Sequence, residues 1–258
     1  MRILISNDDG IDAIGIKALI SEMRKLGEVV VVAPDTQRSA SSHCLTINGS
    51  IKVKEMMLDD DVKGFAVYGT PADCVHLAVK KILKEKPDLI VSGINQGYNI
   101  ASDCIYSGTV AAAREGFILG IPSIAISLNS FTSKDFSYAA EIARHISERF
   151  MTDEHNLDYM LNVNVPAVEK SLIKGLKVCE FAGVRDYDER FEHSQDDEFH
   201  YYHVGPSAVK THLKGDSLNY DYIALKANYV TITPLDIDLV HHQILTSLAD
   251  KWDDHFKL

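Results

Sequence analysis

The chain has 258 residues, of which 26 are Lys or Arg and 37 are Asp or Glu, so that its formal net charge is −11. Hydrophobic residues make up 46% and charged residues 24%, which is typical of globular proteins and unlike disordered chains. The acid excess argues against binding of long nucleic acids, because that needs a basic surface to neutralise phosphates.

The first half of the chain alternates between short apolar runs and segments whose apolar residues recur at helical spacing. Strands are predicted at 2–6, 29–33, 45–53, 65–67, 89–91 and 123–127, and helices at 14–26, 70–84, 107–119 and 139–150. Nearly continuous apolar strands that alternate with helices predict a mostly parallel sheet with helices on both faces. We therefore expect a Rossmann-like, three-layer α/β/α fold.

The second half changes character. Strands are predicted at 160–165 and 176–181, further strands within 221–234, and a terminal helix at 238–248. Residues 185–199 alternate seven acids and two bases with Tyr and Phe, a pattern typical of an exposed hairpin arm or loop. We expect a single domain over residues 1–258, with a core over about 1–180 and protruding arms and a helical tail over about 181–258.

The acidic charge gathers in this second half. Residues 1–129 hold 13 basic and 15 acidic residues, a net charge of −2, whereas residues 130–258 hold 13 and 22, a net charge of −9. The first half, in which the candidate site residues described below all lie, is therefore nearly neutral.

Cysteine usage and the N-terminus bear on location. The four cysteines are Cys44, Cys74, Cys104 and Cys179. They form no CxxC pair or zinc pattern, which is typical of reduced, structural thiols. The start MRILISNDDG lacks the features of a signal peptide, and no apolar run approaches the roughly 18 residues of a membrane span. We expect a soluble, cytoplasmic protein without membrane partners.

Polar segments follow several predicted strands. Asn7-Asp8-Asp9-Gly10 comes directly after the first strand, and two adjacent carboxylates repel each other unless a cation or base lies between them. Carboxylate oxygens suit Mg²⁺, Ca²⁺ or Mn²⁺. The alternative is a plain turn, which explains this segment when it is taken alone, because Asn, Asp and Gly are preferred turn residues.

Two further loops offer oxygen atoms. The loop 35–43 contains Arg38, Ser39, Ser41 and Ser42. Its hydroxyls can ligate a hard cation and its Arg can hold phosphate, although a solvated Ser-rich loop has the same composition. The segment 92–99, SGINQGYN, contributes the amide oxygens of Asn95 and Asn99, and its glycines allow close approach of a ligand. Here too a simple turn is the alternative.

Ser107-Gly108-Thr109 opens the alanine-rich helix predicted at 107–119. Unpaired backbone N–H groups and the helix dipole make such a helix start an anion site, whereas Ser107 as a plain N-cap needs no ligand. The P-loop pattern GxxxxGK[ST] is absent, so this helix start is not a P-loop. The dinucleotide pattern GxGxxG is also absent, which argues against a nicotinamide cofactor.

The relative placement of these segments is stronger evidence for a binding site than any one segment alone. The carboxyl ends of parallel strands meet at one edge of a sheet, where ligands bind. Two carboxylates, a hydroxyl, an amide oxygen and an anion cradle gathered there indicate a divalent metal beside a phosphate. GxSxG is absent. The histidines are scattered and are expected to be surface or packing residues, with a catalytic one left open: His43, His76, His145, His155, His241 and His242.

Seven blocks in chain order resemble the survival protein SurE family of metal-dependent 5'-nucleotidases. They are ILISNDDG, APDTQRSASS, YGTPADCV, VSGINQGYN, YSGTVAAAREG with GIPSIAIS, LNVNVP and YVTITPL. The resemblance runs from Met1 to about Leu235. The chain departs from the family at Asn228, where a Gly is frequent, at Thr231 in place of Ser, and in the acidic arm, which puts the arms and the substrate preference in question.

The resemblance implies that Asp8, Asp9, Ser39 and Asn95 hold one divalent metal ion per subunit, Mg²⁺ or Mn²⁺. It also implies a Rossmann-like core, a homodimer or homotetramer with exchanged C-terminal segments, and activity on nucleoside monophosphates. Some members also act on 3'-nucleotides or short polyphosphate.

The resulting hypothesis is a metal-dependent phosphomonoesterase that hydrolyses nucleoside 5'-monophosphates. Asp8 and Asp9 are the expected catalytic residues, as ligands, base or nucleophile. Ser107, Gly108 and Thr109 are expected to bind the phosphate, helped by Asn99. The alternatives are a phosphatase for polyphosphate or another small phosphoester, a nucleotide-binding regulatory protein without turnover, and an NAD-binding protein, which the missing glycine pattern disfavours.

Overall fold

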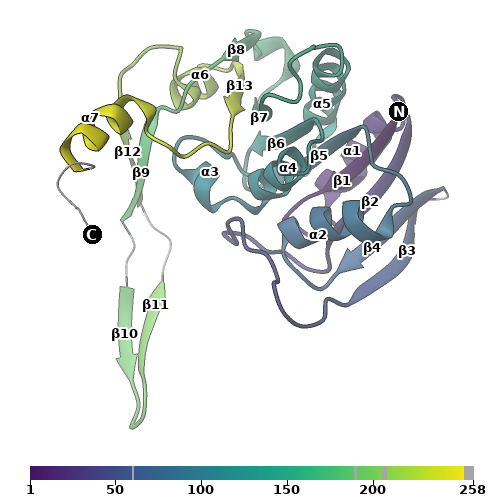
Figure 1. Ribbon diagram of the computed structural model, residues 1–258, viewed down its shortest axis with the longest axis horizontal. Coiled ribbons are helices and arrows are strands. Elements are labelled where there is room, and N and C mark those ends of the chain that lie inside the picture. The colour runs from purple at the N-terminus through teal and green to yellow at the C-terminus, as the bar shows by residue number, and fades with distance from the viewer. Residues whose placement is uncertain (60, 189–190, 205–207, 253–258) are drawn as a thin grey trace.

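The computed structural model describes residues 1–258 except 60, 189–190, 205–207 and 253–258, so parts of the expected arm and tail lie outside the described residues. Nine strands form one sheet in the order β3-β4-β2-β1-β5-β6-β7-β13-β8 (Figure 1). The strands are β1 (Arg2–Ser6), β2 (Glu28–Pro34), β3 (Val53–Asp59), β4 (Val62–Val67), β5 (Leu89–Gln96), β6 (Ser123–Asn129), β7 (Met160–Pro166), β8 (Leu176–Val178) and β13 (Val230–Leu235). Neighbouring strands are parallel except in the pairs β3–β4 and β7–β13, which confirms the predicted mostly parallel sheet.

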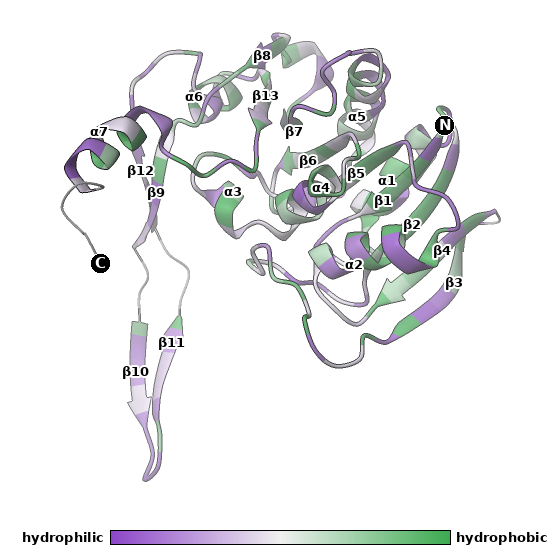
Figure 2. Cartoon of the chain, in the orientation of Figure 1, coloured by the Kyte–Doolittle hydropathy of each residue, from purple (hydrophilic) through white to green (hydrophobic). Residues whose placement is uncertain are grey.

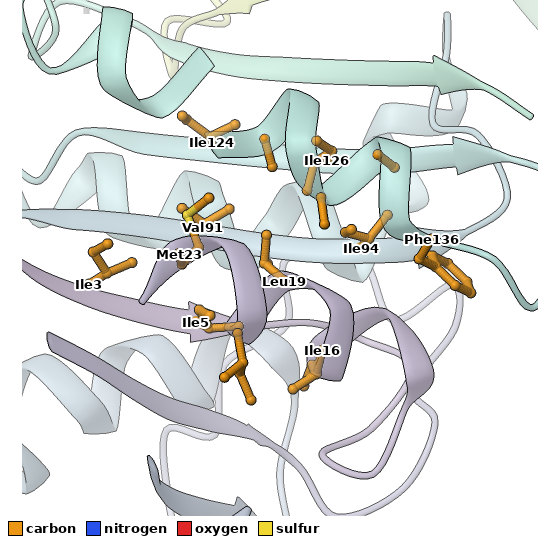
Figure 3. Close-up of a cluster of buried hydrophobic side chains, with 14 of the residues drawn as sticks. Ile3, Ile5, Ile16, Leu19, Met23, Val91, Ile94, Ile124, Ile126 and Phe136 are labelled. Carbon is orange, nitrogen blue, oxygen red and sulfur yellow. The ribbon is translucent and has the colours of Figure 1, made fainter. Parts of the chain in front are cut away.

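The principal helices are α1 (Ile14–Met23), α2 (Pro71–Leu77), α3 (Asp103–Tyr106), α4 (Gly108–Ile118), α5 (Ser137–Phe150), α6 (Asp221–Lys226) and α7 (His242–Trp252), and short helical turns cover Ala78–Ile82 and Lys170–Leu172. Alternate residues of β1 point to opposite faces of the sheet. Ile3 and Ile5 pack in one core with residues of α1 and α5 (Figure 3), while Leu4 packs with residues of α2 and α4. Two apolar cores on either side of one sheet give the three-layer architecture.

Three predicted elements differ in the structure. Residues 45–52, expected as the start of a strand, are a loop before β3, because Thr46 donates two hydrogen bonds to the carboxylate of Asp73 instead of pairing with a strand. The helix predicted over 70–84 ends as α2 at Leu77 and continues as the π-helical turn. Residues 221–226, expected as strand, form α6.

The second half projects an arm from the core (Figure 1). Its base pairs β9 (Gly183–Asp188) with β12 (Ala208–Leu213), and its outer part pairs β10 (Phe191–Gln195) with β11 (His200–Val204). Both outer strands are exposed along their whole length, and most of their residues are hydrophilic, except for the paired Phe191 and Val204 (Figure 2). No helix in the described part of the chain is long and apolar enough to cross a membrane.

Candidate metal and phosphate site

Asp8 and Asp9 lie in a tight turn at the carboxyl end of β1. The amide of Asn7 closes the turn, because its Nδ2 donates to the carbonyl oxygen of Gly10 at 2.9 Å and its Oδ1 accepts from the Gly10 N–H at 3.2 Å. The turn interpretation of this segment is therefore also correct. The turn places the carboxylates of Asp8 and Asp9 next to each other at the carboxyl edge of the sheet.

Asp8 is buried against the start of α4. Only 4% of the residue is exposed, and its Oδ1 accepts a short hydrogen bond from the Thr109 hydroxyl. Burial raises the pKa of Asp8 to about 6; the Thr109 bond opposes this shift and the neighbouring Asp9 charge adds to it. The Arg38 N–H also donates to the Asp8 carbonyl oxygen at 2.7 Å, which draws the loop after β2 over the site.

Asp9 connects two other predicted loops. Its Oδ2 accepts from the Gln96 N–H at 3.0 Å, and its Oδ1 lies 3.4 Å from Nε2 of Gln37, which also donates to the Ser39 hydroxyl at 3.0 Å. The Gln37 amide thus lies between the side-chain oxygens of Asp9 and Ser39. Burial raises the pKa of Asp9 as well, against hydrogen bonds that lower it.

Asn95 occupies the end of β5, a strand that extends beyond the predicted 89–91 and shifts register against β6 between Ser92 and Asn95. Its Nδ2 donates to the carbonyl oxygen of Gly97 at 2.9 Å. Because an amide nitrogen only donates hydrogen bonds, Oδ1 is the atom of this side chain that can act as a ligand.

The start of α4 approaches Asp8 closely. Ser107 is the N-cap, and its Oγ accepts from the Val110 N–H at 3.1 Å, as the plain capping interpretation requires. A Cβ on Gly108 would lie 2.7 Å from Cβ of Asp8 and 2.9 Å from Oγ of Ser41. The absence of a side chain at position 108 therefore lets the carboxylate lie against the helix N-terminus.

Ser41, which the sequence offers as one of several candidate hydroxyls in the loop 35–43, also lies at the start of α4. Its Oγ is buried and has no hydrogen-bond partner among the described residues, yet it faces the first residue of α4. Buried hydroxyls are normally paired, so an unpaired one beside a helix N-terminus points to a ligand. Only the position of Gly108 relative to the loop after β2 reveals it, and no local pattern encodes that contact.

Asn99 lies differently from the other predicted residues. Its Nδ2 donates to Oγ of Ser127 at 2.8 Å, and its backbone N–H donates to Oδ1 of Asn164 at 2.8 Å. These bonds join Asn99 to β6 and β7, whereas Asp8 bonds to Thr109 and Asp9 bonds to Gln96 and Gln37.

The oxygens at this edge are chemically mixed. Within the described ranges, no three His, Cys, Asp or Glu side chains cluster in a way that could hold a metal ion. A cation here would therefore combine two carboxylates with neutral hydroxyl and amide oxygens, which are donors that hard divalent cations accept.

Comparison with known proteins places the chain in a family. The model of the family described as survival protein SurE matches residues 3–188. "5'-Nucleotidase SurE" of Synechococcus elongatus is 44% identical over 255 residues, covering 96% of this chain and 98% of that protein. The protein of the same name from Chlorobium chlorochromatii is 41% identical over 252 residues, covering 97% and 91%.

A solved structure agrees with these sequence matches. The crystal structure of SurE protein from Aquifex aeolicus superposes with a TM-score of 0.81 at 38% identity, covering 97% of this chain and 99% of that one. The fold, the matched family model and the near full-length relatives together show that this chain belongs to the survival protein SurE family.

Proposed function

We propose that this chain is a metal-dependent phosphomonoesterase that hydrolyses nucleoside 5'-monophosphates, and also 3'-monophosphates, to nucleoside and phosphate. The observation that carries the proposal is the close approach of the buried Asp8 carboxylate to the N-terminus of α4, with Gly108 between them. A pair of carboxylates beside an anion-binding helix start suits a cation and a phosphate held together. The names of the relatives support the nucleotide substrate.

The residues present fit one divalent ion, Mg²⁺ or Mn²⁺, held by Asp8, Asp9, Ser39 and Asn95. Burial raises the pKa of both carboxyls, so ionising the pair is costly without a compensating positive charge. The convergence of the Asp9 and Ser39 oxygens on one Gln37 nitrogen supports a shared position for a cation. When bound, such an ion polarises a phosphoryl oxygen and lowers the pKa of a water ligand.

The phosphate would be held by the first turn of α4. The N–H groups of Gly108 and Thr109 and the helix dipole attract the anion, and Ser107 shapes the turn by capping it. The unpaired Ser41 hydroxyl supplies a further donor on the same side. Thr109 holds Asp8 in place, and Asn99 supports the loop that follows Asn95 through its bonds to β6 and β7.

Asp8 and Asp9 would act as ligands, and one of them as base or nucleophile. Replacing Asp9 by Asn keeps the shape and removes the charge, so we predict a drop in AMP hydrolysis of at least about 100-fold, the range for loss of a positioned acid–base group. Phosphate release, together with Mn²⁺ binding by calorimetry, checks this. A variant that still binds Mn²⁺ and retains the wild-type rate would contradict the catalytic role.

We also propose a homodimer or homotetramer formed through the C-terminal arms. The fully exposed outer strands β10 and β11, which carry large apolar side chains, support a partner surface. A cytoplasmic location is proposed from the four cysteines, all of which are present as free thiols.

A further inference from the structure

Phe131 presents an exposed aromatic ring beside the candidate site. It lies in the connection between β6 and α5, after the carboxyl end of β6, and 66% of the residue is exposed. The carboxylates that follow β1 lie at the same carboxyl edge of the sheet.

The ring is held by the segment that contains the predicted ligand Asn95. Phe131 packs edge-to-face against Tyr98, with ring centroids 5.4 Å apart and an interplanar angle of 73°. Gly97 leaves the space that the ring occupies, because a Cβ there would lie 2.5 Å from Cε1 of Phe131, and its φ of +119° also disfavours a side chain. The Gly97 carbonyl oxygen accepts the hydrogen bond from Asn95. Gly97 therefore lies between the Phe131 ring and the predicted metal ligand Asn95.

The backbone of Phe131 is tied to the other side of the site. The side-chain amide of Gln96 donates to the carbonyl oxygens of Phe131 and Ser133 at 3.0 and 3.2 Å, while the backbone N–H of Gln96 donates to Asp9. Within the same turn, Oγ of Ser130 accepts from the N–H groups of Thr132 and Ser133. An exposed ring on a turn with this many hydrogen bonds is positioned before any ligand arrives.

We propose that Phe131 is the platform on which the nucleobase of the substrate stacks. The inference rests on the proposed function, in which the phosphate lies at the α4 N-terminus and the base lies one ribose away. Every nucleobase offers a π-face, and stacking on an aromatic side chain contributes binding without reading hydrogen-bonding groups. Because the ring is already positioned, stacking incurs little ordering cost. Phe131 therefore acts on affinity for the base and leaves the reacting phosphate untouched.

Two substrates that share the phosphate and differ in the base test this proposal. Steady-state hydrolysis of AMP and of ribose 5-phosphate is measured with Mn²⁺ for the wild type, Phe131→Ala and Phe131→Trp. We expect Phe131→Ala to raise KM for AMP about 5- to 150-fold, the range for loss of one stacked base, with kcat within twofold. Its kcat/KM for ribose 5-phosphate stays at the wild-type value, and Phe131→Trp restores KM for AMP.

Leu157→Ala is the matched control, since Leu157 is also about half exposed but follows α5 at the opposite edge of the sheet. It should leave both substrates unaffected. An unchanged KM for AMP in Phe131→Ala, or an equal loss for both substrates, overturns the stacking role while leaving the phosphatase activity standing. A wild type that releases phosphate from neither substrate overturns the proposed function itself.

Discussion

At the scale of single residues, Gly108 shows how narrow the site is. Its missing side chain leaves room for the Cβ of Asp8 and the hydroxyl of Ser41, both of which an added Cβ would approach within 3 Å. We predict that Gly108→Ala lowers AMP hydrolysis roughly 100-fold, the effect of a displacement of about 1 Å at a reacting centre. Urea unfolding should show a loss of about 1–3 kcal/mol, the cost of overpacking, because the added Cβ would also lie 2.9 Å from Cγ of Pro71. A rate within twofold of wild type would show that the site does not need the space that Gly108 leaves beside Asp8 and Ser41.

Glu115 offers a residue whose effect depends on pH. Its side chain is 3% exposed in α4, and its two oxygens lie 2.8 Å from Nε2 of His43 and 2.7 Å from Nδ1 of His76. Burial alone raises the pKa of Glu115, but the hydrogen bonds and charges of the two histidines outweigh it, and the pKa is lowered from the usual 4.5. A carboxyl with a lowered folded-state pKa stabilises the fold above its unfolded pKa and loses this contribution as pH falls through the folded pKa.

We therefore predict that Glu115→Gln lowers the free energy of unfolding by about 1–3 kcal/mol at pH 6, the cost of weakening a buried, charged hydrogen-bond pair. The difference from wild type should shrink as the pH falls below the usual pKa of 4.5 towards the lowered folded-state pKa. Urea unfolding at pH 6 and pH 3.5 measures both values. The same stability deficit at both pH values would contradict the role assigned to the Glu115 charge.

The residues that sequence reasoning could and could not find differ in how far their partners lie along the chain. Asp8, Asp9 and the 107–109 turn stand out because their own neighbours mark a strand end or a helix start. His43 was expected as a surface or packing residue, yet it pairs with Glu115, 72 residues away. Local patterns carry no information on such a contact, which the sheet topology creates.

At the scale of elements, Asp73 joins α2 to the loop that carries the serines. It completes the capping box of α2 with Thr70, and its two carboxylate oxygens each accept a hydrogen bond from Thr46 at 2.8 Å. We predict that Asp73→Ala destabilises the fold by about 2–4 kcal/mol, more than a cap alone, because it also removes the acceptor of the two hydrogen bonds from Thr46. It should also expose the loop to tryptic cleavage after Arg38 or Lys52.

The matched control is Asp135→Ala, which removes an exposed carboxylate that accepts from the Ser137 N–H at 2.9 Å near the start of α5. It should cost about 1 kcal/mol and leave the loop 35–52 resistant to trypsin. Urea unfolding and limited proteolysis compare the two variants. Equal resistance of that loop in both would show that Asp73 does not tether it.

The same contact explains where element prediction failed. Residues 45–52 contain alternating apolar side chains and were predicted as strand, but Ile47 is 90% exposed and the segment is a loop. The alternation is a local property, whereas the pairing that decides the matter is a bond to Asp73 in another element. The strands of the parallel sheet were predictable because each is apolar along its own length.

At the scale of the whole molecule, the arm exposes large apolar side chains, including Phe191 at 55% and Tyr202 and Val204 at 64% each. We predict that the wild type sediments at micromolar concentration as a dimer or tetramer of the 28.7 kDa chain, and that a Tyr202→Asp, Val204→Asp variant dissociates. Leu157→Ala, which changes an exposed apolar residue outside the arm, should remain associated. A monomeric wild type would contradict the proposed assembly.

That residues 1–258 form one domain stays a prediction.

The net charge of the chain is also unevenly distributed relative to the candidate site. The half that contains the candidate site has a net charge of −2, and two of its acids are the proposed ligands Asp8 and Asp9. A bound cation inverts the local field, so an anionic monoester can approach where bare carboxylates would repel it. The remaining charge of −9 lies in the half that includes the arm, and we expect it to disfavour binding of long nucleic acids.

Phosphate release from AMP, GMP and short polyphosphate, measured with Mn²⁺, with Mg²⁺ and after chelation by EDTA, tests whether this chain is a cation-dependent nucleotidase. We expect release from the nucleoside monophosphates that requires the added cation, is lost with EDTA and is lower for polyphosphate. Equal release with and without cation would contradict the metal site, and preferential release from polyphosphate would contradict the nucleotide substrate.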